Sequence, residues 1–122
     1  SCNSINLFGR EITMSTKLAE KTATEAADRE VGAFTTLIDN DRTRITHWVL
    51  KPGQQTGWHL HDFDYVTLQQ SEGTLFLEHA DGSERTIEYV PGTAASISAP
   101  VEHNAMNIGD VDIVVTEIEY KI

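Results

Sequence analysis

The sequence predicts an all-β protein, an antiparallel sandwich or jelly-roll barrel built as one domain. From position 34 onward, short runs of β-branched and aromatic residues alternate with Pro-Gly, Asp-Gly and similar turn pairs. These turns recur about every eight to twelve residues, a spacing typical of sandwiches and barrels. The chain of 122 residues is long enough for one such core but not for two independent cores.

The first thirty residues differ in composition from the rest, so we divide the chain into an N-terminal extension, 1–30, and a barrel, 31–122. Residues 17–30 are rich in Ala, Glu and Lys but lack a clear apolar stripe, which predicts an irregular or weakly helical lead-in. We interpret residues 1–13 as a non-native cloning remnant or an upstream in-frame extension, because Met14 begins a segment that resembles a natural start.

Three of the first four predicted strands end at a turn signal. Polar residues 39–41 close the first strand, Pro52-Gly53 stops the second, and Ser71-Glu72-Gly73 follows the fourth. The third strand is short and carries two histidines. These four strands span residues 34–38, 42–51, 58–61 and 65–70.

The last five predicted strands follow the same rule. Asp81-Gly82 is a hairpin signal between the first two of them, and Pro91-Gly92 and Gly109-Asp110 mark later turns. No convincing helix interrupts this part of the chain. These five strands span residues 74–79, 84–90, 93–98, 103–108 and 111–120.

The charge is unevenly distributed and argues against two classes of partner. The formal net charge is -10. Residues 52–122 hold only Arg85 and Lys121 as Lys or Arg side chains against twelve carboxylates, whereas residues 1–51 are balanced. An acidic surface repels phosphate groups, so we expect neither nucleic acid nor a membrane surface as a partner.

Cysteine usage and hydropathy indicate the compartment. Cys2 is the single cysteine, so no intramolecular disulfide can form, which fits a reducing compartment. No run of about 18 apolar residues is present. The N-terminal residues also lack the pattern of a secretory signal. We therefore expect a cytoplasmic protein.

The most informative residues are His59 and His61, read together with the distant His103. Side chains two positions apart on a strand point to the same face, so a His-x-His strand aims two imidazoles at one point. A third imidazole from another strand completes a nitrogen site for a transition metal. We predict His59, His61 and His103 as metal ligands.

At these positions the chain resembles the cupin superfamily. The first cupin motif joins a Gly, a His-x-His pair, a Glu and a second Gly, and the second motif joins Gly, Pro, Gly, His and Asn. The residues of this chain that match in register are Gly53, His59, His61, Gly73, Gly92, His103 and Asn107. The resemblance covers about residues 40–122 and implies a small jelly-roll barrel with a metal ion at its open mouth.

The glutamate of the first cupin motif is absent, since Tyr65 and Val66 occupy its two registers. Three neutral histidines alone leave a divalent ion with its full charge and with open positions for an anionic substrate. Asp64 is the alternative fourth ligand, after a local bulge, although regular strand parity does not place it beside the histidines.

Four further residues are candidates for the site, each with a structural alternative. Tyr65 is the candidate acid or base if it points into the barrel, and otherwise packs in the core. Trp48 and Trp58 wall a substrate cavity or simply pack. Arg44 shares its strand parity with Trp48 and would bind a substrate carboxylate, the alternative being a surface or interface ion pair.

Three acidic or titratable positions are interpreted as structural. Glu117 and Glu119 share one face of the last predicted strand, which we take as a solvated or interface face, with entry of one of them into the cavity as the alternative. His79 lies at a hairpin end and is expected to be solvated.

The three-histidine pattern is similar to that of thiol dioxygenases and diketone-cleaving dioxygenases, which use Fe(II). Our first hypothesis is a metal-dependent enzyme that acts on a small organic acid or similar polar metabolite. With Fe(II) it would be a dioxygenase, and with Zn, Mn or Ni isomerase or lyase chemistry is more natural. A non-catalytic ligand-binding cupin and a degenerate metal-free cupin are the alternatives. The resemblance also implies a homodimer formed through the strand at 34–38.

Overall fold

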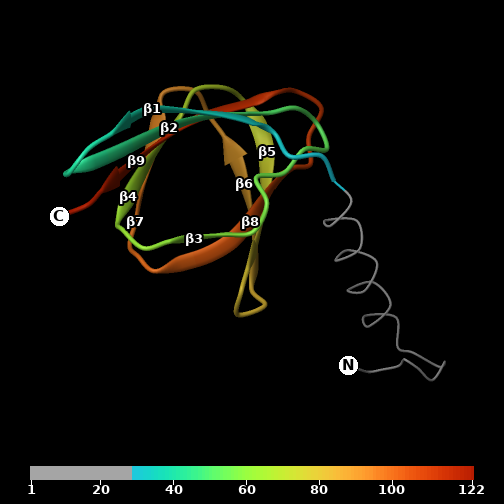
Figure 1. The fold of residues 1–122 in the computed structure, drawn as a ribbon. Helices are drawn as coiled ribbons and strands as arrows, with labels where there is room; N and C mark the ends of the chain where they lie inside the picture. The colour runs from blue at the N-terminus through green and yellow to red at the C-terminus, as the bar shows by residue number, and fades with distance from the viewer. Residues whose placement is uncertain (1–28) are drawn as a thin grey trace, which may run out of the picture.

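The fold is given by a computed structural model, in which residues 29–122 are described. These residues form nine strands and no helix (Figure 1). The strands are β1 (Ala33–Asp39), β2 (Thr43–Leu50), β3 (His59–His61), β4 (Tyr65–Gln69), β5 (Gly73–His79), β6 (Glu84–Tyr89), β7 (Thr93–Ile97), β8 (Val101–Asn107) and β9 (Ile113–Tyr120).

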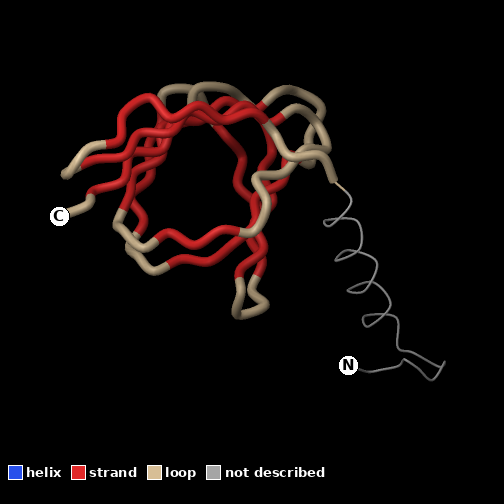
Figure 2. The backbone as a smooth tube through the Cα atoms, in the orientation of Figure 1, coloured by secondary structure: helices blue, strands red, loops and turns tan. Residues whose placement is uncertain are grey.

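The strands form two antiparallel sheets that together enclose a barrel. One sheet has five strands in the order β1-β2-β9-β4-β7, and the other has four in the order β3-β8-β5-β6. Figure 2 shows the strands arranged as a ring, with loops connecting them around its rim. Non-consecutive neighbours such as β2–β9 and β5–β8 show that the sheets are not simple meanders, as expected of a jelly roll.

The register of the strands separates an apolar end of the barrel from a polar end. Along β9, the inward positions run from the fully buried Ile113 and from Val115 to Glu117 and Glu119. Along β5, Leu75 and Leu77 precede His79 in the same way. The apolar core therefore fills one end, and it comprises Leu50, Leu75, Leu77, Tyr89, Ala105, Ile113 and Val115.

Asn107 fastens this apolar end. Its side-chain amide donates hydrogen bonds to the carbonyl oxygens of Leu50 at 2.8 Å and Val111 at 2.7 Å, and its oxygen accepts one from the Gly109 amide at 2.9 Å. Asn107 is 1% exposed, so these bonds satisfy a polar group that would otherwise be costly to bury. The cupin-motif asparagine thus holds loop backbone in place.

The predicted all-β jelly roll is confirmed, and each predicted strand overlaps an observed one with its bounds shifted by only one or two residues. The predictions for the lead-in and for residues 1–13 lie outside the described residues, apart from positions 29 and 30. Among the residues that the structure describes, no helix could span a membrane.

Candidate metal centre

The loop before β3 fixes the first of the three histidines. Gly57 adopts a positive φ of 87°, and its amide donates a hydrogen bond to the side-chain oxygen of the buried Asn104 at 3.0 Å. Its carbonyl oxygen then accepts a hydrogen bond from Nδ1 of His59 at 2.8 Å. Because a carbonyl only accepts, Nδ1 of His59 carries the proton and Nε2 keeps its lone pair.

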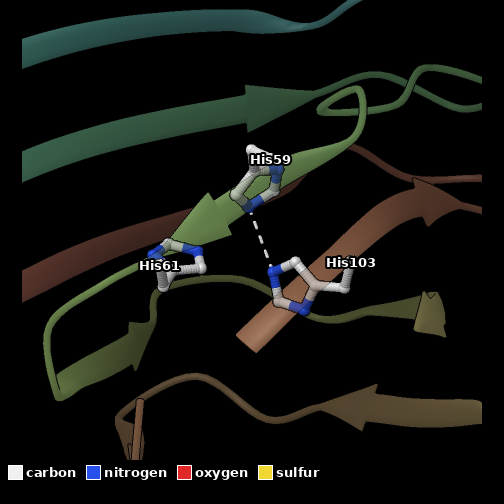
Figure 3. Close-up of side chains that lie close together, drawn as sticks. All are labelled: His59, His61 and His103. Carbon is white, nitrogen blue, oxygen red and sulfur yellow. Dashed lines mark hydrogen bonds between the residues drawn. The ribbon is translucent and has the colours of Figure 1, made fainter. Parts of the chain in front are cut away.

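His103 lies directly across from His59, as the two residues are partners in the β3–β8 pairing. Their Nε2 atoms are 3.0 Å apart, and Figure 3 shows the two rings, with that of His61, turned toward one another. Each of the three histidines offers a ring nitrogen, and these nitrogens all lie within 4.8 Å of one another. The structure therefore brings together the three histidines that the sequence singles out.

His61 is held by a buried carboxylate. Its Nδ1 donates to Oε2 of Glu119 at 3.0 Å, which leaves the lone pair on Nε2. Glu119 also pairs with Nη1 of Arg44 at 3.2 Å, and Arg44 reaches Asp39 at 3.7 Å through Nε. His61 and Glu119 are 4% and 6% exposed, so this contact fixes the orientation of the ring within the barrel.

Burial keeps two of the rings uncharged. Burial lowers the pKa of His59, and the nearby His61 lowers it further. The hydrogen bond to the Gly57 carbonyl raises this pKa but does not offset the effect of burial. Burial lowers the pKa of His103 to about 3, helped by the neighbouring rings of His59, His61 and His79. Neutral imidazoles have a free lone pair, which is the form that binds a metal ion.

The three nitrogens fit a transition-metal ion. Nε2 of His61 and Nδ1 of His103 are buried without a hydrogen-bond partner among residues 29–122. Two nitrogens held about 2.1 Å from one ion at a right angle would lie about 3.0 Å apart, and the Nε2 atoms of His59 and His103 have a separation of 3.0 Å. A divalent ion would satisfy the lone pair of His61 that the protein leaves unpartnered.

Tyr65 lies against this cluster. Its ring stacks on His61 with centroids 4.1 Å apart, and it is 3% exposed. Burial raises the pKa of its hydroxyl, and the carboxylates of Glu117 and Glu119 raise it further. Tyr65 therefore stays protonated and can donate a hydrogen bond or a proton to a group in the cavity.

A cavity of about 240 Å³ runs from the histidines toward the apolar core. His59, His79 and His103 line one part of it. The other polar lining residues come from several strands, and they are Trp48, Thr56, Tyr65, Thr67, Gln69, Arg85, Tyr89 and Glu117. Trp48 lines the cavity and also packs on Phe34 with ring centroids 4.8 Å apart, so both alternatives for this residue apply, and its contact with a substrate stays a prediction.

Three other predicted residues lie away from this cavity. The side chain of Asp64 accepts a hydrogen bond from the Ala99 amide at 2.8 Å and is not brought to the histidines. Trp58 is 52% exposed. Arg44 forms an ion pair with Glu119, the residue that binds His61, so it is linked to the site only indirectly. Its binding of a substrate carboxylate stays a prediction.

The structure adds four residues that the sequence interpretation did not place at the site. Glu119 contacts His61, and Glu117 lines the cavity, which corrects the interpretation of both as a solvated face and bears out the alternative. His79 also lines the cavity, with its ring 5.6 Å from that of His103 and Nδ1 buried, so it is not simply solvated. Arg85 is the fourth.

Comparison with known proteins gives one curated relative and many similar structures. No model of a known protein family matches the chain. The chain is 39% identical over 87 residues to the β-alanine degradation protein BauB of Pseudomonas aeruginosa. This alignment covers 71% of this chain and 90% of the relative.

Solved structures agree on the fold. A cupin domain from Bordetella pertussis superposes with a TM-score of 0.73 and is 38% identical, covering 78% of this chain and 98% of that one. An RmlC-like cupin from Methanocaldococcus jannaschii, described as a double-stranded β-helix, has a TM-score of 0.63 at 17% identity, covering 76% and 83%. The polyketide cyclase RemF from Streptomyces resistomycificus has a TM-score of 0.58 at 22% identity, covering 78% and 70%.

Proposed function

Since this chain belongs to the cupin superfamily, we propose that it is a metal-dependent cupin enzyme that acts on a small polar metabolite. One observation carries the proposal: three imidazoles converge at one end of a cavity, with Nε2 of His61 buried and unpartnered among the described residues. Such an arrangement is costly to bury unless a ligand completes it.

His59, His61 and His103 would hold the ion. A bound divalent ion supplies Lewis-acid chemistry and, if it is Fe(II), redox chemistry with dioxygen. None of these three ligands is a carboxylate, so a bound ion would retain its full positive charge. The same three-histidine ligand pattern is found in dioxygenases of the cupin superfamily. Zn, Mn or Ni would instead suit isomerase or lyase chemistry.

The protein's own side chains would bind the substrate and move a proton. Trp48, Ile87 and Ile97 give the cavity apolar walls that exclude water from a bound molecule. Tyr65 presents a protonated hydroxyl next to His61, and we assign it the role of proton or hydrogen-bond donor. The size of the cavity, about 240 Å³, limits the substrate to a small molecule.

The curated relative supports a metabolic role. Its name links that protein to the breakdown of β-alanine, a small polar metabolite. The name describes the relative, and the identity of 39% supports a catabolic substrate of similar size for this chain.

The proposal is tested by loading the purified protein with Fe(II), Zn²⁺, Mn²⁺ or Ni²⁺ and measuring the metal content and affinity. We expect about one ion per chain, bound more tightly than micromolar, and loss of that ion in His103→Ala. His47→Ala is the matched control, because His47 contacts Thr116 and lies outside the cluster.

Oxygen consumption by the Fe(II)-loaded protein with small organic acids then separates dioxygenase chemistry from the alternatives. Consumption in the wild type that disappears in His103→Ala supports the dioxygenase assignment. Failure to bind any of the four ions at micromolar concentration would contradict the metal-dependent function and leave a non-catalytic ligand-binding or degenerate cupin.

A further inference from the structure

Arg85 is an exposed residue of β6 that also lines the cavity. It lies on β6, opposite the buried Leu77 of β5, and shares its parity with Ile87 and Tyr89, which also face the cavity. Among the residues lining the cavity, it is the one Lys or Arg. The part of the chain from 52 to 120 contains no other Lys or Arg, so its single strong cation faces the cavity.

Arg85 has no partner that explains this position. No salt bridge or side-chain hydrogen bond to Arg85 is formed within residues 29–122, although Glu84 and Glu88 lie on the same strand and twelve carboxylates lie in this part of the sequence. Glu88 binds Thr74 instead. A guanidinium that faces a cavity without a carboxylate partner is suited to bind a carboxylate of a ligand.

Glu117 lies on the opposite wall. It belongs to β9, in the middle of the five-stranded sheet, while Arg85 is on the edge strand of the four-stranded sheet. Glu117 lines the same cavity, and in the described part of the chain no Lys or Arg forms a salt bridge with it. Burial raises the pKa of Glu117 and so does the nearby Glu119, whereas His61 and a hydrogen bond with Trp48 lower it. A bound cation would lower it further.

Arg85 and Glu117 therefore form two opposite poles, which we name the cavity dipole. Both line one cavity, yet no ion pair within residues 29–122 joins them, so the space between them is available to a ligand.

The cavity dipole lies beside the metal centre. Arg85 belongs to the cross-strand row of Leu77 and Ala105, which adjoins the row of His79 and His103. Glu117 is the next inward position on β9 before Glu119, the partner of His61. A ligand bound between the two poles would therefore lie next to the three imidazoles.

We propose that the cavity binds a small zwitterion, with its carboxylate against Arg85 and its ammonium group against Glu117. The zwitterion would be the substrate of the site, and this assignment as a substrate rests on the proposed function. A ligand without net charge is also the class that best enters a barrel whose residues 52–122 carry ten more carboxylates than Lys and Arg. A simple anion would be repelled by Glu117, and a simple cation would be repelled by Arg85.

The test uses the protein loaded with Zn²⁺, which is redox-inert, and isothermal titration calorimetry. The probes are glycine, β-alanine, 4-aminobutyrate and 5-aminopentanoate, because the length that binds best reports the separation of the poles. The best of these is compared with the carboxylic acid and the amine of the same carbon length. We expect the zwitterion to bind at least about 10-fold more tightly than either single-charge compound.

Charge-removing variants identify the poles. Arg85→Gln should weaken the binding of the zwitterion by about 10- to 100-fold and should not weaken the binding of the amine, which Arg85 repels. Glu117→Gln should remove the preference for the zwitterion over the carboxylic acid. Arg42→Gln, in the turn after β1, and Glu88→Gln, on the outer side of β6, are matched controls and should leave all affinities unchanged.

The outcomes separate this inference from the proposed function. Zinc is quantified in the wild type and in every variant, and a wild-type protein that holds neither zinc nor any of the other three ions contradicts the metal-dependent function. A zinc-loaded protein that binds the zwitterion no better than the matched acid and amine overturns the cavity dipole alone. Equal losses in Arg85→Gln and Arg42→Gln would also overturn it.

Discussion

At the level of single residues, the carboxylate beside the candidate metal centre comes from a different position than the glutamate of the cupin motif. The motif position holds Tyr65 or Val66, and Tyr65 stacks on His61. Glu119, from the distant β9, instead binds the far nitrogen of His61 at 3.0 Å. If an ion is bound, Glu119 would act on it through the imidazole, by raising the basicity of His61 without being a ligand itself.

Glu119→Gln should therefore weaken metal binding without removing it. We expect the affinity for Zn²⁺ to fall by about 10- to 100-fold, because the amide removes the charge that orients and polarises His61. A competition titration with a chelating dye measures this change. Glu88→Gln is the control, and an unchanged affinity in Glu119→Gln would show that the contact with His61 is only structural.

The metal-free protein should lose stability in acid through His103. The ordinary pKa of 6.5 in the unfolded chain falls to about 3 in the fold, mainly because the ring is buried. Between these values the unfolded chain binds a proton that the folded chain does not, so this contribution is complete above about pH 6.5 and is lost as the pH falls toward 3.

Urea unfolding of the metal-free protein at several pH values measures this loss. His103→Gln cannot take up the proton, so its free energy of unfolding should fall less steeply over the same range. If both proteins lose stability equally between about pH 6.5 and pH 4, His103 is not the group responsible.

At the level of strands, Gly73 sets how closely β5 approaches β9. It has a φ of 137°, and a Cβ added there would lie 2.6 Å from Cγ1 of Ile113, which is fully buried. Gly73→Ala should therefore destabilise the fold by about 2 kcal/mol or more, from backbone strain and overpacking together.

Gly82→Ala is the matched control for this effect. Gly82 also has a positive φ, 90°, but a Cβ there would meet nothing within 4 Å. Thermal unfolding of both variants separates the packing cost at Gly73 from the backbone cost that the two share. Equal shifts in the unfolding midpoint would mean that Ile113 moves away without cost.

Much of this strand arrangement was predictable from the sequence, but the contacts between sheets were not. Turn residues and the His-x-His spacing place each strand and aim His59 and His61 at one point. The position of Glu119 depends on which face of β9 points inward, and both faces are apolar, with Ile113 and Val115 on one and Val114 and Ile118 on the other. The pairing of β9 between β2 and β4 decides this, and local pattern does not encode it.

At the level of the whole molecule, the outer face of β1 indicates how the chain assembles. All seven residues of β1 are exposed, and Phe34, Leu37 and Ile38 are 58%, 57% and 45% exposed. β1 is also an edge strand, and an exposed apolar edge is a surface that proteins normally cover. We propose that a second copy of this chain covers it.

Light scattering coupled to gel filtration tests this assembly. The chain has a mass of 13.6 kDa, and a homodimer would elute with about twice that mass. Leu37→Glu should shift the protein toward the monomer, because it places a charge on the covered face. A wild-type mass of one chain at micromolar concentration would contradict the homodimer.

The metal centre is tested most directly by an anomalous-scattering map from crystals of the metal-loaded protein. We predict one peak per chain, about 2.0–2.3 Å from ring nitrogens of His59, His61 and His103, with Glu119 on the far side of His61. A map with no peak among these three rings, in a protein saturated with metal, would contradict the central claim.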